Sequence, residues 1–250
     1  MQLPFNRHGL DPWGISKDHL AFAYGCIEPV YREWFRVKVE GAENVPSQGR
    51  AMLVGNHSGG LPFDAMLVLG SMFFEMDPPR LAHGMVEKLA QNWPVASPLF
   101  SRIGQLAGLP EHAVRLLEDD RILMVYPEGV RGLGKLHTER YELAGFGTGF
   151  VRIALESRSP IVPFGVIGAE EAYPVVARLE PLARLMGLPY IPVPSHLVPV
   201  PLPRTCTIRY GEPLYFEGTG HEGDEVIADL VEQVKVRVDE LIAPGRERSS

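Results

Sequence analysis

The chain has 250 residues, of which 45% are hydrophobic and 22% are charged, as in a folded globular protein built on one large domain. Its formal net charge of −7 argues against a protein that binds nucleic acid by bulk electrostatic attraction. Cys26 and Cys206 have the spacing of neither a metal site nor a disulfide framework, so we expect a reducing, cytoplasmic environment and no bound metal. We recognise no secretory signal and no apolar run of about 18–20 residues, so we expect no membrane-spanning helix.

Residues 1–35 are predicted to form an N-terminal arm followed by an amphipathic helical segment. Ser16 is a suitable N-cap, and from the next residue apolar side chains recur at helical spacing as far as Trp34. Pro29 lies inside this pattern and is expected to kink or split the helix. A second unit, residues 36–245, is predicted to be the main domain.

The main domain is predicted to be of the α/β class, because short apolar runs typical of buried strands alternate with helical patterns. The predicted strands are residues 36–39, 51–55, 122–126, 161–167 and 206–210, and the predicted helices are residues 65–74, 149–157 and 224–242. This order predicts a mixed, largely parallel central sheet flanked by helices. In such sheets, sites gather at the carboxyl ends of the strands.

The first candidate site follows a predicted buried strand directly and extends from Asn56 to Asp64. It contains His57, and imidazole is the usual general base near neutral pH because its ordinary pKa is about 6.5. A carboxylate at the second ring nitrogen would fix the tautomer and stabilise the imidazolium, and Asp64 is the nearest downstream candidate. Gly59 and Gly60 allow the backbone to approach a ligand closely. Taken alone, the loop could equally be a turn in which these residues serve only geometry.

Ser58 offers a second interpretation of the same loop. A serine nucleophile elbow has glycine two residues before and two residues after the serine, whereas Asn56 stands at the first of these positions here. A hydrolase of lipids or thioesters that uses Ser58, or a water activated by His57, is therefore the alternative class of enzyme. A metal site is not indicated, because no close ligand spacing links His57 to the histidines at 83, 112 and 137.

The second candidate site reads Tyr-Pro-Glu-Gly-Val-Arg over residues 126–131 and also ends a predicted buried strand. A Pro-Glu-Gly turn can present the Glu128 carboxylate, and Arg131 can hold a phosphate through paired hydrogen bonds. The alternative is a solvated turn with two neighbouring surface charges.

Together the two motifs resemble the glycerolipid and lysophospholipid acyltransferase superfamily, including the 1-acylglycerol-3-phosphate acyltransferases. Members carry Asn-His followed by Asp, then a Phe-Pro-Glu-Gly-Thr-Arg type block, then a hydrophobic Val-Pro block, which residues 160–163 match here. The resemblance covers roughly residues 35–215. Six residues rather than the usual four separate His57 from Asp64, and Val130 replaces the threonine. With its Asn-His-Ser-Gly-Gly loop, the chain looks closer to the monoacylglycerol and diacylglycerol acyltransferase-like branch.

The resemblance implies transfer of a fatty acyl group from acyl-CoA or acyl carrier protein to a hydroxyl of a glycerolipid or lysophospholipid, as in phospholipid biosynthesis. His57 would be the general base and Asp64 would orient it, with no acyl-enzyme and no tightly bound cofactor. The implied substrate-binding residues are Ser58, Gly59 and Gly60 at the oxyanion, Glu128, Gly129 and Arg131 at the acceptor, and Lys135 and Arg140 as lesser candidates for anionic groups.

An enzyme that handles acyl chains needs access to a bilayer, and two segments are candidates for this contact. The N-terminal helix carries Phe22, Tyr31 and Trp34 beside basic residues, as interfacial helices do. Residues 182–203 are apolar and contain six prolines, which exclude a long helix and predict an extended excursion. We therefore expect peripheral association with a membrane surface. A lipid-binding module that has lost turnover is the third alternative.

Overall fold

The computed structural model describes residues 5–86, 96–185 and 190–248. The described residues form a seven-stranded central sheet in which neighbouring strands run parallel, except for one antiparallel pair, β6 and β9. From edge to edge its strands are β1 (Lys38–Glu40), β9 (Thr207–Tyr210), β6 (Ile161–Ile167), β2 (Ala51–Gly55), β5 (Ile122–Val125), β3 (Ala82–Val86) and β4 (Leu106–Ala107). The predicted mixed, largely parallel sheet is confirmed.

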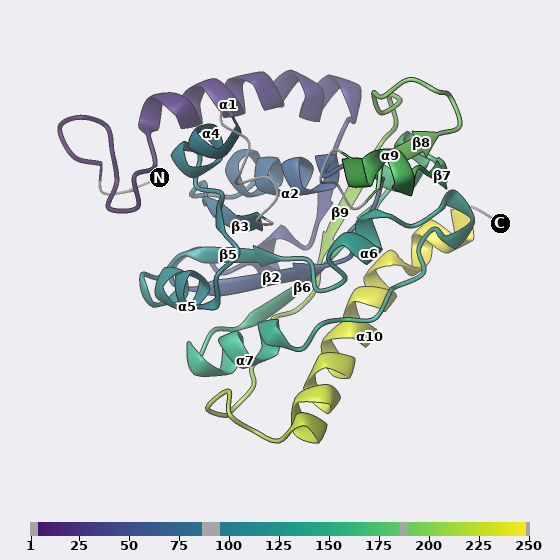
Figure 1. The fold of residues 1–250 in the computed structure, drawn as a ribbon. Coiled ribbons are helices and arrows are strands. Elements are labelled where there is room, and N and C mark those ends of the chain that lie inside the picture. The colour runs from purple at the N-terminus through teal and green to yellow at the C-terminus, as the bar shows by residue number, and fades with distance from the viewer. Residues whose placement is uncertain (1–4, 87–95, 186–189, 249–250) are drawn as a thin grey trace.

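Helices cover both faces of this sheet, as Figure 1 shows. On one side lie α1 (Lys17–Pro29) and α2 (Phe63–Phe74), and on the other α5 (Pro110–Glu118), α7 (Gly149–Glu156) and α10 (Asp224–Arg248). The shorter helices are α4 (Ala96–Arg102), α6 (Val130–Leu133), α8 (Ala169–Ala172) and α9 (Glu180–Leu185), with 3₁₀ turns at Ala42–Asn44 and His137–Glu139.

Side chains of the central strands alternate between two hydrophobic cores. In β2, Leu53 joins the core beneath α2, whereas Met52 and Val54 join the core shared with α7 and α10. All five residues of this strand are buried, because both faces of the sheet are covered. The continuous apolar run in the sequence is the direct consequence of this arrangement.

The N-terminal helix begins and breaks where the sequence predicts. The Ser16 hydroxyl accepts a hydrogen bond from the His19 amide and so caps α1. At Pro29 the α-helix gives way to a five-residue π-helix, Val30–Trp34, since proline cannot donate the next helical hydrogen bond. The helix packs on α2 through a stack of the Tyr24 and Phe73 rings, whose centroids lie 4.1 Å apart.

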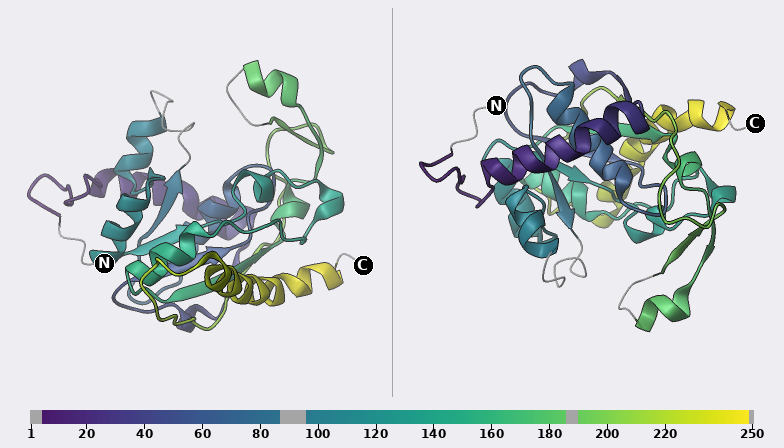
Figure 2. Two further views of the ribbon diagram at one scale, coloured as in Figure 1. Left: turned by 60° about the horizontal axis from the view of Figure 1, so that its bottom comes forward. Right: turned by 90° about the horizontal axis from the view of Figure 1, so that it is seen from above.

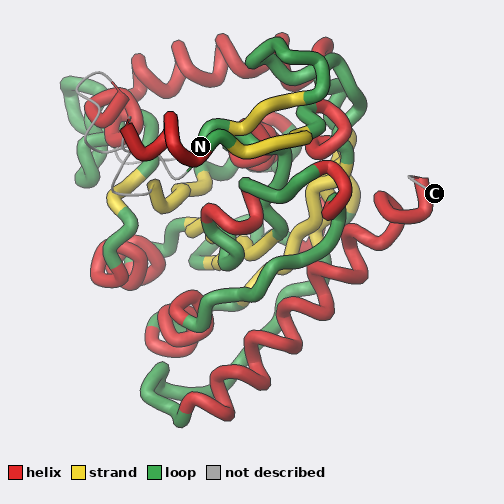
Figure 3. The backbone as a smooth tube through the Cα atoms, turned by 45° about the vertical axis from the view of Figure 1, so that its right-hand side comes forward, coloured by secondary structure: helices red, strands yellow, loops and turns green. Residues whose placement is uncertain are grey.

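The proline-rich excursion forms a small unit of its own. Strands β7 (Val175–Arg178) and β8 (Pro192–Pro194) pair in antiparallel fashion, and with α9 they project from the body of the molecule (Figure 2). Figure 3 shows this hairpin apart from the central sheet. Extended chain was wrong for the start of the segment, because Pro181 fits the first turn of α9. Residues 186–189 of the predicted excursion lie outside the described residues.

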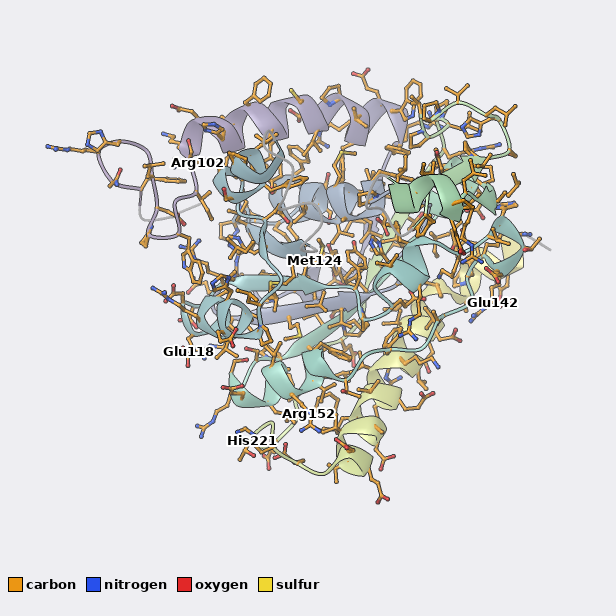
Figure 4. All side chains as sticks on the ribbon, in the orientation of Figure 1. Arg102, Glu118, Met124, Glu142, Arg152 and His221 are labelled. Atoms are coloured by element: carbon orange, nitrogen blue, oxygen red, sulfur yellow. The ribbon has the colours of Figure 1, made fainter. Side chains whose placement is uncertain are left out.

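The closing helix α10 is anchored at its start by α7. One guanidinium nitrogen of Arg152, Nη1, donates to the Gly220 carbonyl at 2.8 Å, and Nη2 lies 2.7 Å from Asp224 Oδ1. Figure 4 shows Arg152 beside the loop that carries His221. Over the described part of the chain, we find no helix with the length and apolar character needed to cross a bilayer.

Candidate active site

The two sequence motifs meet at one edge of the sheet. Strands β2 and β5 are parallel neighbours, so the loops that follow Gly55 and Val125 leave the sheet side by side. One hydrogen bond joins the loops directly, because the backbone amide of His57 donates to Glu128 Oε1 at 2.9 Å. This is the edge at which open α/β sheets build their sites.

The structure brings Asp64 to His57. Asp64 lies in the first turn of α2 with its side chain fully enclosed, and its Oδ2 is 2.8 Å from His57 Nδ1. The same oxygen accepts the Ser58 amide at 2.9 Å, while Oδ1 accepts the Ala65 amide at 2.8 Å. An acceptor bonded to Nδ1 fixes the proton on that nitrogen, which leaves Nε2 unprotonated and able to act as a base.

Gly59 and Gly60 shape the loop between His57 and Asp64. Both have positive φ angles, +86° and +68°, which side chains rarely allow. A Cβ atom on Gly60 would also lie 2.5 Å from Val175 Cγ2 in β7, so the loop is packed against the projecting hairpin. The longer spacing is therefore compatible with a direct contact between His57 and Asp64.

Two residues inside the motifs have roles that the sequence did not assign. The Asn56 side-chain amide forms two hydrogen bonds with the backbone of Val166 in β6, at 2.7 and 3.1 Å, and so fixes the start of the loop. The Tyr126 ring stacks on the imidazole of His57 with centroids 4.1 Å apart. Burial raises the pKa of Tyr126, so the ring stays neutral against the imidazole. The sequence feature that could have indicated this role of Asn56 is its position as a polar residue directly after a fully apolar strand.

The backbone amides of Ser58, Gly59 and Gly60, which were predicted to bind the oxyanion, differ in their hydrogen bonds. The Ser58 amide is bonded to Asp64, and the Gly60 amide donates to the Leu133 carbonyl at 3.0 Å. Both amides are therefore already engaged, whereas the Gly59 amide has no hydrogen bond to another described residue. The Ser58 hydroxyl is buried and has no hydrogen-bond partner among the described residues, so His57 does not activate it in this structure.

Glu128 and Lys135 point inward rather than toward solvent. The Glu128 side chain is fully enclosed, and its second oxygen, Oε2, accepts the Ala144 amide at 2.6 Å. The Lys135 side chain is 8% exposed, with its ammonium 3.4 Å from that oxygen. The sequence predicted that both side chains contact a substrate. In the structure, their charges instead contact one another and polar groups of the backbone. Gly129, at φ +57°, forms the turn into α6.

The two arginines of the second motif region lie nearer the surface. Arg131 is exposed, and its Nη2 donates to the Gly145 carbonyl at 2.7 Å. Arg140 is half-buried, and its Nη1 donates to the His137 carbonyl at 3.2 Å. Among the described residues, no group of three or more His, Cys, Asp or Glu side chains is arranged to hold a metal ion.

Comparison with known proteins shows the family of the chain. The family model described as Acyltransferase matches residues 36–167, which include both motifs. An uncharacterized protein of Mycobacterium leprae is 36% identical over 85% of the chain, and the chain spans 60% of that relative's length. A human protein named as a DGAT1/2-independent enzyme synthesizing storage lipids is 26% identical over 56% of the chain and 42% of its own length.

The fold has a solved counterpart as well. The crystal structure of the 1-acyl-sn-glycerophosphate acyltransferase PlsC from Thermotoga maritima matches with a TM-score of 0.59. The match covers 89% of this chain and 79% of that one at 19% identity, so it bears on the fold alone. The chain belongs to the Acyltransferase family, which confirms the resemblance drawn from the motifs.

Proposed function

We propose that the chain transfers a fatty acyl group from an acyl thioester, acyl-CoA or acyl carrier protein, to a hydroxyl of a glycerolipid or lysophospholipid. His57 Nε2 takes the proton of the acceptor hydroxyl as its oxygen attacks the thioester carbonyl carbon. The tetrahedral intermediate then collapses, the C–S bond breaks, and the imidazolium returns the proton to the departing thiolate. Asp64 holds the imidazole in place and stabilises its charged form.

The observation that carries this proposal is the 2.8 Å contact between His57 Nδ1 and the enclosed Asp64 carboxylate in a chain of the Acyltransferase family. Hydrolysis through Ser58 has less support, because the buried hydroxyl forms no bond to His57. In this mechanism the Gly59 amide donates to the oxyanion. Arg131, which remains exposed, is the proposed contact for an anionic group of the acceptor or of the donor.

The experiment is a transfer assay with purified protein. Labelled acyl-CoA or acyl carrier protein is supplied with lysophospholipids, monoacylglycerol or diacylglycerol, and the lipid products are separated. We expect label in an acylated acceptor. Free fatty acid as the sole product would favour a hydrolase that uses a His57-activated water, and retained lipid without turnover would favour a binding module.

We further propose that one apolar face of the molecule contacts a lipid surface. It consists of exposed side chains on the N-terminal helical segment and on the loop after β8: Phe22, Trp34, Leu197, Val198 and Val200. The two segments are joined, since Trp34 Nε1 donates to the Pro201 carbonyl at 3.0 Å. Prolines in the loop lack an N–H group, which lowers the cost of placing its backbone among lipids.

Replacing both Leu197 and Val198 by serine should weaken binding to phosphatidylcholine–phosphatidylglycerol vesicles by roughly 10- to 100-fold, from the apolar area lost. Sedimentation with the vesicles measures this. The control replaces Val226 and Val236, which are 50% and 46% exposed on α10, by serine. Equal losses in the two double variants would contradict a lipid contact specific to this face.

A further inference from the structure

The backbone of the His57 loop is held by a buried carboxylate. Glu128 accepts the His57 amide at Oε1 and the Ala144 amide at Oε2, at 2.9 and 2.6 Å, and its side chain has no exposed surface. The carboxylate therefore clamps the loop after β2 to the segment near Ala144. Two amide donors on one carboxylate form strong, charge-assisted hydrogen bonds only while the group is ionised.

Lys135 is the cation that faces this clamp. Its ammonium lies 3.4 Å from Glu128 Oε2 and 3.5 Å from Glu170 Oε1, and it donates to the Glu142 carbonyl at 2.9 Å. All three charged side chains are nearly enclosed, with exposures of 8% for Lys135, 0% for Glu128 and 6% for Glu170. One buried positive charge thus stands between two buried carboxylates.

Glu170 connects this group to the rest of the domain. Its Oε2 accepts the Tyr141 amide at 2.7 Å, and the Tyr141 carbonyl accepts a hydrogen bond from Arg246 in α10. Figure 4 places Glu142 beside the C-terminal part of this helix. Burial raises the pKa of Glu170 to about 7, with Lys135 opposing the shift and Glu171 and Glu128 adding to it. Glu171 itself accepts the Tyr141 hydroxyl.

The consequence of losing the cation follows from electrostatics. Without the ammonium, the negative charges of Glu128 and Glu170 repel each other in a buried site with no cation to offset them. This repulsion displaces the Glu128 carboxylate, so that at least one of its two amide hydrogen bonds weakens. The backbone of His57 then loses its anchor, although the imidazole itself is unchanged.

We propose that Lys135 is a positioning residue for His57, whose buried ammonium balances Glu128 and Glu170 and so keeps the Glu128 clamp closed on the His57 backbone. The expected change in kcat rests on the proposed function. It replaces the expectation that Lys135 binds an anionic group of a substrate.

The test uses Lys135→Met, Glu170→Gln and the double variant, with Lys235→Met in α10 as the matched control. The carbonyl oxygen of the glutamine introduced by Glu170→Gln can still accept the Tyr141 amide, while the second buried negative charge is removed. In Lys135→Met we expect kcat to fall roughly 10- to 100-fold, as for a displaced catalytic group, with KM for both substrates within about twofold. The double variant should recover most of kcat, and Lys235→Met should behave as the parent.

A second readout does not depend on turnover. The ¹H–¹⁵N signals of the His57 and Ala144 amides report directly on the clamp, so they should shift in Lys135→Met and stay at their parent positions in the double variant. If Lys135→Met does not fold, the test is whether adding Glu170→Gln restores folding. We expect the double variant to fold and to show amide signals like those of the parent.

A raised KM with unchanged kcat, or amide signals and activity that Glu170→Gln does not restore, would overturn the proposal. A parent chain that transfers no acyl group would refute the proposed function, whereas the positions of the amide signals would still decide the role of Lys135.

Discussion

Replacing His57 by alanine is expected to lower acyl transfer by roughly 10²–10⁴-fold, the usual contribution of a general base. The Asp64 carboxylate and the Gly59 amide remain in place, so substrate binding should change little. The imidazole stacks on Tyr126, so the variant should also lose about 1 kcal/mol of folding stability. The transfer assay and a urea unfolding curve measure the two effects.

The control for this variant is His221→Ala, which removes an exposed histidine from the loop before α10. It should keep full activity and stability. Full transfer by His57→Ala would exclude His57 as the base and with it the proposed mechanism.

The exchange Asp64→Asn is expected to lower kcat by roughly 10²-fold or more, because it removes the charge that stabilises the imidazolium. The structure adds a second effect. The Asp64 carboxylate accepts hydrogen bonds from His57, Ser58 and Ala65, whereas an asparagine amide would place a donor against at least one of them. An unmade buried hydrogen bond costs about 1–3 kcal/mol, so the unfolding curve should shift as well.

Asp229→Asn, an exposed exchange in α10, is the matched control and should change neither quantity. A loss of activity below about tenfold in Asp64→Asn would indicate that another group orients His57. Circular dichroism of the variant separates that outcome from a general loss of structure.

The central strands were predictable because their chemistry is local. The runs at 51–55, 122–126 and 161–167 are apolar without interruption, as strands covered on both faces must be, and each is a strand within one residue at its end. The strands β3 and β4 were not predicted. The first, Ala82–Val86, contains a histidine and a glycine, and the second has only two residues, so neither has a recognisable pattern.

Asp64 could be proposed from the sequence as the partner of His57, but the sequence could not show that the two side chains meet. The count of six intervening residues departs from the family spacing, and only the backbone conformation shows how Gly59 and Gly60 accommodate it. Loop geometry of this kind depends on what the loop packs against, here Val175 and Pro192 of the projecting hairpin, which lie far from Gly60 in the sequence.

Hydrophobic periodicity and short motifs are properties of neighbouring residues, so the fold class, the order of the two motifs and their place at the ends of buried strands could be predicted without a structure. Which charged side chains are exposed and which are buried against one another became visible only in the folded chain. Glu128, Lys135 and Glu170 are spread over 43 residues of chain (128 to 170, both included), and their burial in one group follows from the meeting of separate loops. The direction of a charged side chain is set by the dielectric and the partners around it, and these exist only once the chain has folded.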